Sequence, residues 1–447
     1  APVLKPRGQA ARALRDTLPF ELTRAQHKAL AEIRADLARP FPMQRLLQGD
    51  VGSGKTVVAA LAALQCVENG YQVALMAPTE ILAEQHYAQF SRWLAPLGIA
   101  PAWVAGGMKK NDKKNMLEKI SQGEAMIAVG THALFEEEVR FKNLGLAIID
   151  EQQRFGVHQR LALRMKGGRP NRNAQPHQLM MSATPIPRTL AMSYYADLDV
   201  SVIDEMPPGR SPVATKLVSE TRRGEVIQRI RDACMAGSQA YWVCPLIEES
   251  ETLQLKTALD THAALAATFP ELKLGVVHGR LKPADKARVM AEFKDGAIQL
   301  LVATTVIEVG VDVPNATLMV IEHAERMGLA QLHQLRGRVG RGAAASACIL
   351  LYQNSLTPTA RERLRIIYEN TDGFEIARHD LKLRGPGEFL GARQSGVPML
   401  RFADLEADLD LLDAARSQAE RLLREEPEAA RAHLMRWLGA KHEYLKV

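Results

Sequence analysis

The sequence has few cysteines and no long hydrophobic run, and these absences argue against a disulfide-rich protein and against a membrane-spanning one. Its four cysteines are widely spaced and form no C-x-x-C pair, so neither a disulfide framework nor a cysteine-based zinc site is expected. No apolar run approaches the ~18 residues that a membrane-spanning helix needs, and the first residues contain no signal-peptide core. There is no internal repeat and no low-complexity tract. These observations predict a cytoplasmic protein that does not enter a membrane.

The remaining composition is that of an ordinary globular protein. Of the 447 residues, 47% are hydrophobic and 24% are charged, which is enough apolar material for large buried cores. The length predicts about three domains. The formal net charge of +6 favours a polyanionic partner but does not identify one, because many basic proteins bind no nucleic acid. The chain begins with alanine rather than methionine, so we expect a fragment of a longer protein.

The strongest pattern in the chain is GDVGSGKT at residues 49–56, which matches a phosphate-binding loop at every fixed position. Glycines let the main chain curl so that successive amides point at a polyphosphate. Lys55 would reach the β- and γ-phosphates, and the Thr56 hydroxyl would bind Mg²⁺. A strand candidate at 44–48 precedes the loop and a helix candidate at 57–64 follows it, with its positive N-terminal end at the phosphates. A chance glycine-rich turn is the alternative; we expect ATP and Mg²⁺ to be bound by Gly49, Gly52, Ser53, Gly54, Lys55 and Thr56.

The second strong pattern is an apolar strand, residues 144–149, that runs into Asp150 and Glu151. Asp150 would hold Mg²⁺, and Glu151 would orient and polarise the water that attacks the γ-phosphate. Adjacent acids are common in turns, so the pair alone would say little. Placed after a complete phosphate loop, it predicts a site of ATP hydrolysis.

The rest of the first half alternates strands, loops and helices, which predicts a parallel sheet with ligands at the carboxyl ends of its strands. Thr23 is a plausible N-cap of a helix that runs to residue 37. Strands at 72–77, 125–129 and 178–181 end in Pro78-Thr79, Gly130-Thr131 and Ser182-Ala183-Thr184. Ser182 and Thr184 could sense the Asp150–Glu151 pair, or they could simply end a strand in a turn. The lysine-rich residues 109–114 are read as a solvated helix face, with a phosphate-contacting patch as the alternative.

A proline-rich stretch at residues 207–212 predicts the boundary between two halves of similar αβ character. The second half has strand candidates at 240–244, 275–277, 300–303, 317–321 and 348–352, but no phosphate loop of its own. It carries QLRGRVGR at 334–341, in which Arg338 and Arg341 could act as arginine fingers on the ATP of the first half. A contact with nucleic-acid phosphates and a solvated loop are the alternatives. The finger role requires ATP to lie in a cleft between the halves.

From about residue 357 the chain changes character again. Thr357-Pro358 begins one helix, a second follows Asp372-Gly373, and residues 383–396 are too glycine-rich for a continuous helix. A final amphipathic helix is expected over residues 405–423. The predicted organisation is therefore a linker at 1–17, an ATP-binding domain at 18–206, a second αβ domain at 207–356 and a helical C-terminal region at 357–447.

The ordered set LTxAQ, GDVGSGKT, APTEILAEQH, GTHAL, IIDEQQRFGV, MSATPIPRT, HGRLKP, ATTVIEVGVDVPNA, QLHQLRGRVGRG and LRGPGEFLGARQSG resembles superfamily-two helicases, and specifically the RecG family. The resemblance runs from about Leu18 to the C-terminus. It implies two RecA-like P-loop domains with parallel sheets, ATP and Mg²⁺ between them, and an ATP-driven DNA translocase that regresses stalled forks and migrates branched DNA. Phe20 and Gln26 match the motif that reads adenine, although an ordinary capped helix is the alternative. Gly310 and Asp312 would contact nucleotide, whereas coupling or DNA contact would fall to Thr79, Thr131, Ser182, Thr184, Thr304, Arg363, Arg384 and Gln394.

The sequence departs from the RecG pattern in two places. Gln153 stands where RecG proteins usually have histidine; an amide can donate and accept as neutral imidazole does, but it cannot titrate. RecG proteins also carry an N-terminal wedge domain with an OB fold, and the residues before Leu18 cannot form one, so we expect the motor without its wedge. The motor of the transcription-repair coupling factor, a non-motor ATP-gated DNA clamp and an RNA helicase are the alternatives. Expected partners are forks, Holliday junctions and single-stranded DNA-binding protein, and a monomer is expected.

Overall fold

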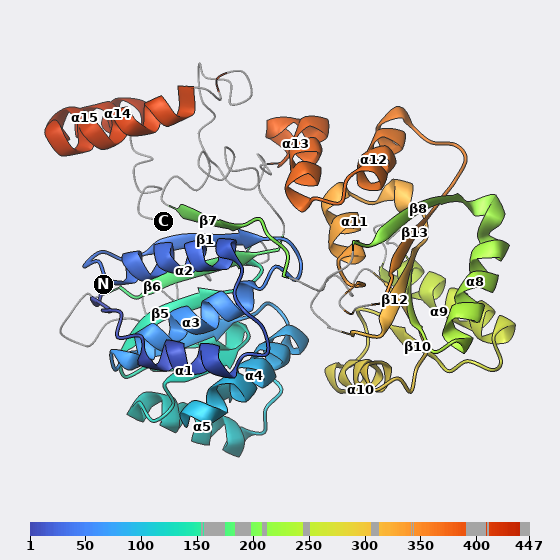
Figure 1. Cartoon of the computed structure of the whole chain (residues 1–447), viewed down its shortest axis with the longest axis horizontal. Helices are drawn as coiled ribbons and strands as arrows, with labels where there is room; N and C mark the ends of the chain where they lie inside the picture. Colours follow the sequence, from blue (N-terminus) through green and yellow to red (C-terminus); the bar gives the residue numbers. More distant parts are fainter. Residues whose placement is uncertain are drawn as a thin grey trace.

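The computed structural model describes residues 1–152, 155, 175–183, 198–207, 212–244, 251–304, 313–340, 342, 344–389, 408 and 411–438. Two parallel sheets, each flanked by helices, form two bodies that lie side by side (Figure 1). Three helices are grouped at the second body: α11 Leu329–Arg336, α12 Pro358–Glu369 and α13 Gly373–Phe389. The predicted fold, two tandem RecA-like α/β domains, is confirmed. Among the described residues, no helix is both long and apolar enough to cross a membrane.

The first sheet has seven strands in the order β3-β4-β2-β5-β6-β1-β7, and all of its strand pairs are parallel. Alternate residues of each strand point to opposite faces, so Leu47 packs with helices α1 to α4 while Leu46 packs on the other face. Both faces are buried, as parallel sheets require. The strands are β1 Gln44–Gly49, β2 Gln72–Met76, β3 Ala102–Val104, β4 Ile127–Gly130, β5 Leu144–Ile149, β6 His177–Ser182 and β7 Asp199–Ile203; the helices are α1 Gln9–Thr17, α2 Arg24–Leu37, α3 Lys55–Glu68, α4 Glu80–Leu94 and α5 Lys110–Gln122.

The second sheet has six strands in the order β10-β11-β9-β12-β13-β8, again all parallel. Tyr241 and Val243 of β9 pack on the face that helices α11 to α13 cover, whereas Trp242 packs on the face of α8 and α9. The residues 207–212 fall between the last strand of the first sheet and the first strand of the second. The strands are β8 Ala214–Ser219, β9 Gln239–Val243, β10 Leu274–Val277, β11 Leu300–Ala303, β12 Ala316–Ile321 and β13 Ala347–Tyr352; the helices are α8 Arg223–Met235, α9 Glu251–Thr268, α10 Pro283–Lys294 and α11 Leu329–Arg336.

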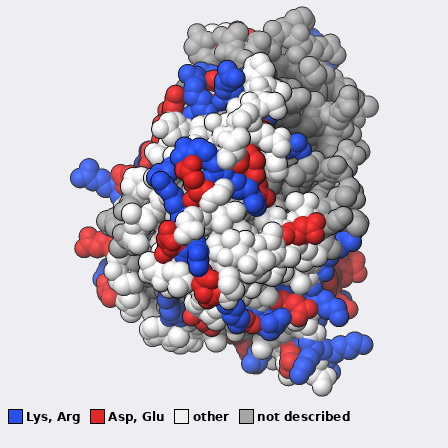
Figure 2. Space-filling model, turned by 90° about the vertical axis from the view of Figure 1, so that its right-hand side faces the viewer, with Lys and Arg blue, Asp and Glu red and all other residues white. Residues whose placement is uncertain are grey.

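The outer face of the second domain carries charges of both signs in close alternation (Figure 2). Several charged side chains of the second domain form ion pairs with one another: Arg222 with Glu225, Arg231 with Glu271, and both Lys273 and Arg288 with Glu292. Exposed pairs of this kind contribute little to stability. They do neutralise the surface, so the described part of this face presents no continuous cationic track.

The N-terminal segment is not the linker that the sequence predicts. Helix α1 buries Ala11 and Leu14 against the first domain. Its first turn lacks a side-chain cap of its own; instead the Glu68 carboxylate at the end of α3 accepts hydrogen bonds from the amides of Gly8 and Ala10, at 3.1 and 2.6 Å. An anion at a helix N-terminus is stabilising. Because this cap comes from a distant helix, local sequence gave no sign of it.

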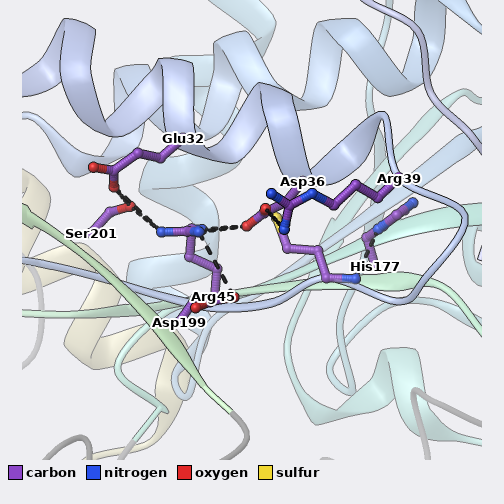
Figure 3. A network of polar contacts seen from close by, with 8 residues as sticks. Glu32, Asp36, Arg39, Arg45, His177, Asp199 and Ser201 are labelled. Carbon is purple, nitrogen blue, oxygen red and sulfur yellow. Dashed lines mark hydrogen bonds and ion pairs between the residues drawn. The ribbon is translucent and has the colours of Figure 1, made fainter. Parts of the chain in front are cut away.

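A buried ion network ties β1 to its neighbours (Figure 3). The Arg45 guanidinium lies 2.6 Å from the Asp36 carboxylate, contacts Glu32 and donates to the Ser201 hydroxyl at 2.9 Å, so α2, β1 and β7 are held together. Nearby, the imidazole of His177 accepts a hydrogen bond at Nδ1 from the Met43 amide and donates from Nε2 to the carbonyl of Pro2. These contacts lie at the amino ends of the strands and are structural.

The C-terminal region differs from the prediction in two respects. Helix α12, Pro358–Glu369, begins at the predicted Thr357 cap, but helix α13, Gly373–Phe389, continues past residue 383, where the loop was expected. Ile376 is anchored in the core of the second domain, and extending an established helix is far easier than starting one. The predicted final helix, residues 405–423, corresponds to α14, Leu412–Glu425, and a second helix that was not predicted, α15 Pro427–Leu438, follows it. Glu426 separates the two, because the residue before a proline is driven out of helical conformation.

Candidate functional site

The phosphate-loop sequence forms the turn between β1 and α3. Gly52 and Gly54 have φ of 79° and 86°, values that favour glycine. A Cβ on Gly54 would lie 2.3 Å from the Gln26 amide nitrogen, so the loop also needs glycine here for space. The Lys55 ammonium turns back and donates to the carbonyls of Gly49 and Asp50, at 2.7 and 3.0 Å. The loop therefore has the curled form of a phosphate cradle, with its lysine folded onto its own main chain.

Asp150 follows directly on β5 and is buried. One carboxylate oxygen accepts from the Glu151 amide at 2.9 Å, and the other lies 2.7 Å from Nε2 of His86 on α4. Burial by itself would raise the pKa of Asp150, but the hydrogen bond and charge of His86, together with Lys55, lower it overall. Glu151 has φ of 49°, a left-handed conformation that costs on the order of 1–3 kcal/mol in a non-glycine residue. Strain of this kind is typical of functional positions.

Residues of both domains line one cavity of about 790 Å³. The first domain contributes the loop, its acid pair and α4, and the second contributes Arg338 and one face of α10. Arg338 is only 6% exposed. The sequence-predicted residues that the structure brings together at this cavity are Gly52, Gly54, Lys55, Thr56, Asp150, Glu151 and Arg338.

The cavity suits a nucleotide with its metal ion. A threonine hydroxyl and an ionised carboxylate are hard oxygen donors, the kind that Mg²⁺ prefers. Within the described part of the chain, the buried hydroxyl of Ser53 has no hydrogen-bond partner, which leaves the loop a donor for a further ligand. Among the described residues, no group of three or more His, Cys, Asp or Glu could hold a metal by itself.

Other predicted residues have local roles in this structure. Phe20 is 42% exposed and does not line the cavity, and Gln26 completes a capping box with Thr23 while donating to the Ser53 carbonyl at 2.8 Å. Thr79 caps α4. Thr131, Ser182 and Thr304 are buried at the carboxyl ends of β4, β6 and β11.

The remaining predicted residues lie on the C-terminal region or outside the described residues. Arg363 on α12 donates to the carbonyls of Met327 and Glu325, at 2.9 and 3.3 Å, and thereby fastens α12 to the segment before α11. Arg384 belongs to α13. The predictions for Gly310, Asp312, Arg341, Thr184 and Gln394, and the Gln153 substitution, fall outside the described residues.

Sequence reasoning missed two histidines at this site. His86 is the last residue of the quoted motif APTEILAEQH, and its contact with Asp150 could have been suggested by that position alone. His333 on α11 lies 2.6 Å from the Asp50 carboxylate in the phosphate loop. Burial would raise the pKa of Asp50, but the hydrogen bond to His333 lowers it overall. A partner 283 residues away leaves no local signal.

Three family models match the chain in order: DEAD/DEAH box helicase at residues 23–193, helicase conserved C-terminal domain at 225–343, and ATP-dependent DNA helicase RecG, domain 3, C-terminal, at 370–442. The ATP-dependent DNA helicase RecG of Acidithiobacillus ferridurans is 56% identical over all 447 residues, which are 64% of its length. That of Escherichia coli K12 is 56% identical over 96% of this chain and 62% of its own. The chain thus spans somewhat less than two thirds of these relatives.

Solved structures give the same result. A RecG bound to a three-way DNA junction matches with a TM-score of 0.74 and 48% identity, over 91% of this chain and 52% of that one. The DEAD-box helicase Mss116 bound to single-stranded RNA matches with a TM-score of 0.63 at 18% identity, over 85% of this chain and 81% of that one, which shows the shared fold alone. Sequence and fold agree, and the chain belongs to the family of the ATP-dependent DNA helicase RecG.

Proposed function

We propose that the protein hydrolyses ATP between its two domains and uses the resulting domain movement to travel along duplex DNA at branched junctions such as stalled forks and Holliday junctions. The meeting of Lys55, Asp150 and Glu151 with Arg338 around one cavity carries this proposal, because phosphoryl transfer depends on positioning and on charge stabilisation. Residues 18–206 and 207–356 would be the two motor domains, and residues 357–447 would convert their movement into movement on DNA.

ATP binding would draw the Lys55 ammonium from the carbonyls of Gly49 and Asp50 to the β- and γ-phosphates. The loop amides and the N-terminal end of α3 would hold the remaining phosphate charge. Thr56 and Asp150 would hold Mg²⁺, which offsets negative charge on the phosphates when bound. The lowered pKa of Asp150 favours the ionised form that this role needs.

Glu151, which directly follows Asp150 and has a strained main-chain conformation, would orient the attacking water. Arg338 would stabilise the charge that develops as the γ-phosphate leaves. Because Arg338 belongs to the second domain, hydrolysis would require that domain to be closed onto the first. From their match to the family motifs, we propose the same role for Arg341 and contacts with the nucleotide for Gly310 and Asp312.

The DNA path would run along the carboxyl edges of the two sheets rather than over the outer face of the second domain. That outer face carries mixed, mutually paired charges, whereas a DNA track needs unopposed cations (Figure 2). Thr79, Thr131 and Thr304 end strands or begin helices at the carboxyl edges. The three-way junction bound by the related RecG favours branched DNA as the substrate. We further propose cytoplasmic location, action as a monomer and single-stranded DNA-binding protein as a partner.

The proposal is tested by ATP hydrolysis rates without DNA and with single-stranded, duplex and forked DNA of equal length. Forked and duplex DNA should stimulate hydrolysis, with forks most effective, and Lys55→Ala should abolish the stimulated rate. Equal rates with and without DNA would reject the motor in favour of an ATP-gated clamp. Stimulation by single-stranded RNA above duplex DNA would identify an RNA helicase instead.

A further inference from the structure

The side chain of Asp50 leaves the phosphate loop and reaches the second domain. One of its carboxylate oxygens accepts the Val51 amide at 2.6 Å and contacts Nε2 of His333 at 2.6 Å. Both residues are buried, with 9% and 4% of their surface exposed. A carboxylate only accepts, so Nε2 must carry the proton and donate it.

The other ring nitrogen of His333 is also engaged. Nδ1 lies 3.2 Å from a terminal nitrogen of Arg336, and a guanidinium only donates, so Nδ1 is the acceptor. His333 therefore relays a directed chain of hydrogen bonds from Arg336 to Asp50. Both ends of the imidazole are fixed, so the ring cannot turn without breaking one of them.

Arg336 carries this chain to the hairpin formed by α12 and α13. Its guanidinium donates to the carbonyls of Ile367 and Asn370, both at 2.8 Å, and of Thr371 at 3.2 Å. The first two are orphan carbonyls at the C-terminal end of α12, where a cation is favourable. The turn that joins the two helices is thus bonded through two side chains to the phosphate loop.

The phosphate loop, α11 and the hairpin turn are also closely packed where these hydrogen bonds are made. A Cβ on Gly373, the first residue of α13, would lie 2.6 Å from Nε2 of His333 and 3.1 Å from the second Asp50 carboxylate oxygen. A Cβ on Gly337 would lie 2.8 Å from the Cβ of Val51 in the loop. The phosphate loop, α11 and the hairpin turn therefore touch directly at one point.

We propose that Asp50, His333 and Arg336 are positioning residues that transmit the nucleotide state of the phosphate loop to the α12–α13 hairpin. The Asp50 carbonyl holds the Lys55 ammonium in this structure, so the arrival of phosphate changes the main chain of the same residue whose side chain holds His333. The hairpin then moves with the loop as one unit. This positioning role rests on the proposed function, because it explains how ATP hydrolysis at the phosphate loop would become movement on DNA.

If the Asp50–His333 contact were purely structural, it would not need to connect the phosphate loop to the hairpin. A buried carboxylate must be paired, but Asp50 already accepts a main-chain amide of its own domain. Its second partner comes from the other domain and is itself bonded toward the hairpin. A structural pair would lower hydrolysis and movement together when broken, whereas a transmitting pair would lower movement per ATP hydrolysed.

The first test compares His333→Ala, Asp50→Ala, Asp50→Asn and the double alanine variant with the parent chain on forked DNA. Phosphate release and displacement of a third strand from the duplex are measured in the same solution. We expect His333→Ala to raise the ATP consumed per displacement by about fivefold or more, the lower end of coupling between sites. The double variant should be no worse than either single one, and Asp50→Asn, which keeps an acceptor, should be milder than Asp50→Ala.

Matched controls separate this effect from damage to the fold. Gly373→Ala should uncouple in the same way, whereas Gly224→Ala, at the start of α8 with nothing within 4 Å, should leave the ratio unchanged. His177→Ala removes another buried, doubly hydrogen-bonded histidine and should lower stability without changing the ratio. Equal loss of hydrolysis and movement in both His333→Ala and Gly373→Ala would overturn the proposal.

A second test does not depend on any activity. The four native cysteines are buried, so cysteines introduced at exposed Ser121 on α5 and Gln228 on α8 can be labelled selectively for energy transfer between the domains. Without nucleotide or DNA, His333→Ala and Gly373→Ala should lower and broaden the transfer efficiency relative to the parent. Unchanged efficiency in both would overturn the positioning role of Asp50, His333 and Arg336. A parent that shows no ATP-driven movement but a clear effect here would reject the proposed function and keep this positioning role.

Discussion

Arg338→Ala should reduce the rate of ATP hydrolysis while leaving ATP binding close to normal. Arg338 is nearly fully buried at the cleft and comes from the domain opposite the phosphate loop, as the proposed arginine-finger role requires. Such a residue is worth about 10³ to 10⁵ in kcat, and the lower figure corresponds to about 4 kcal/mol of transition-state stabilisation. Ground-state affinity depends mainly on Lys55 and the loop amides, so it should change little.

The assay is single-turnover hydrolysis with saturating forked DNA, paired with equilibrium binding of a fluorescent ATP analogue. Arg92→Ala is a matched control, because Arg92 lines the same cavity from α4 of the first domain. We expect the control to stay within about threefold of the parent, as for a cation that does not meet the transferring phosphoryl group. A loss of less than about tenfold for Arg338→Ala, or an equal loss for both variants, would refute the finger assignment.

Three further predictions follow from the site and its support. Glu151→Gln should lower turnover by about 10² to 10⁴ while ATP still binds, since it removes a general base only; near-normal hydrolysis would reject the assignment. Gly54→Ala should weaken ATP binding and lower the melting temperature, because alanine would have to adopt a φ of 86° and its Cβ would collide with the Gln26 side-chain amide. An unchanged Kd for ATP would contradict the assignment of this loop as the phosphate-binding site. Burial lowers the pKa of His177 below its usual 6.5, so the unfolded chain binds more protons and stability should fall as the pH drops below that value, by up to about 1.4 kcal/mol per pH unit. Urea unfolding at pH 7.5 and 5.5 should show a smaller drop for His177→Gln, and an equal drop would refute this.

The parts of the fold that the sequence predicts are those whose signal is local. The strands that precede the phosphate loop and the acid pair, β1 and β5, each appear within a residue or two of their expected limits, and β5 is a continuous apolar run. Strands β3, β7 and β8 were missed because they are short or only half buried, which blurs the apolar pattern. The N-terminal helix was missed because its cap, Glu68, belongs to another helix.

The residues of the candidate site can also be divided into those with a local sequence signal and those without one. Lys55, Asp150 and Arg338 stand in motifs with fixed spacing, so their chemistry was predictable before their geometry was known. The pairs Asp50–His333 and His86–Asp150 are tertiary contacts between residues that no spacing rule connects. The Gln26 side chain adds two contacts that its motif did not reveal: its amide donates to the Ser53 carbonyl in the phosphate loop and accepts from the Thr23 amide at its own cap.

Displacement of a third DNA strand from a forked duplex tests the central claim most directly, because it reports movement along DNA rather than binding or hydrolysis. We predict displacement that requires hydrolysable ATP, proceeds faster from forked than from blunt duplex DNA, and disappears in Lys55→Ala. Displacement that continues in Lys55→Ala, or its absence in the parent despite DNA-stimulated ATP hydrolysis, would contradict the account.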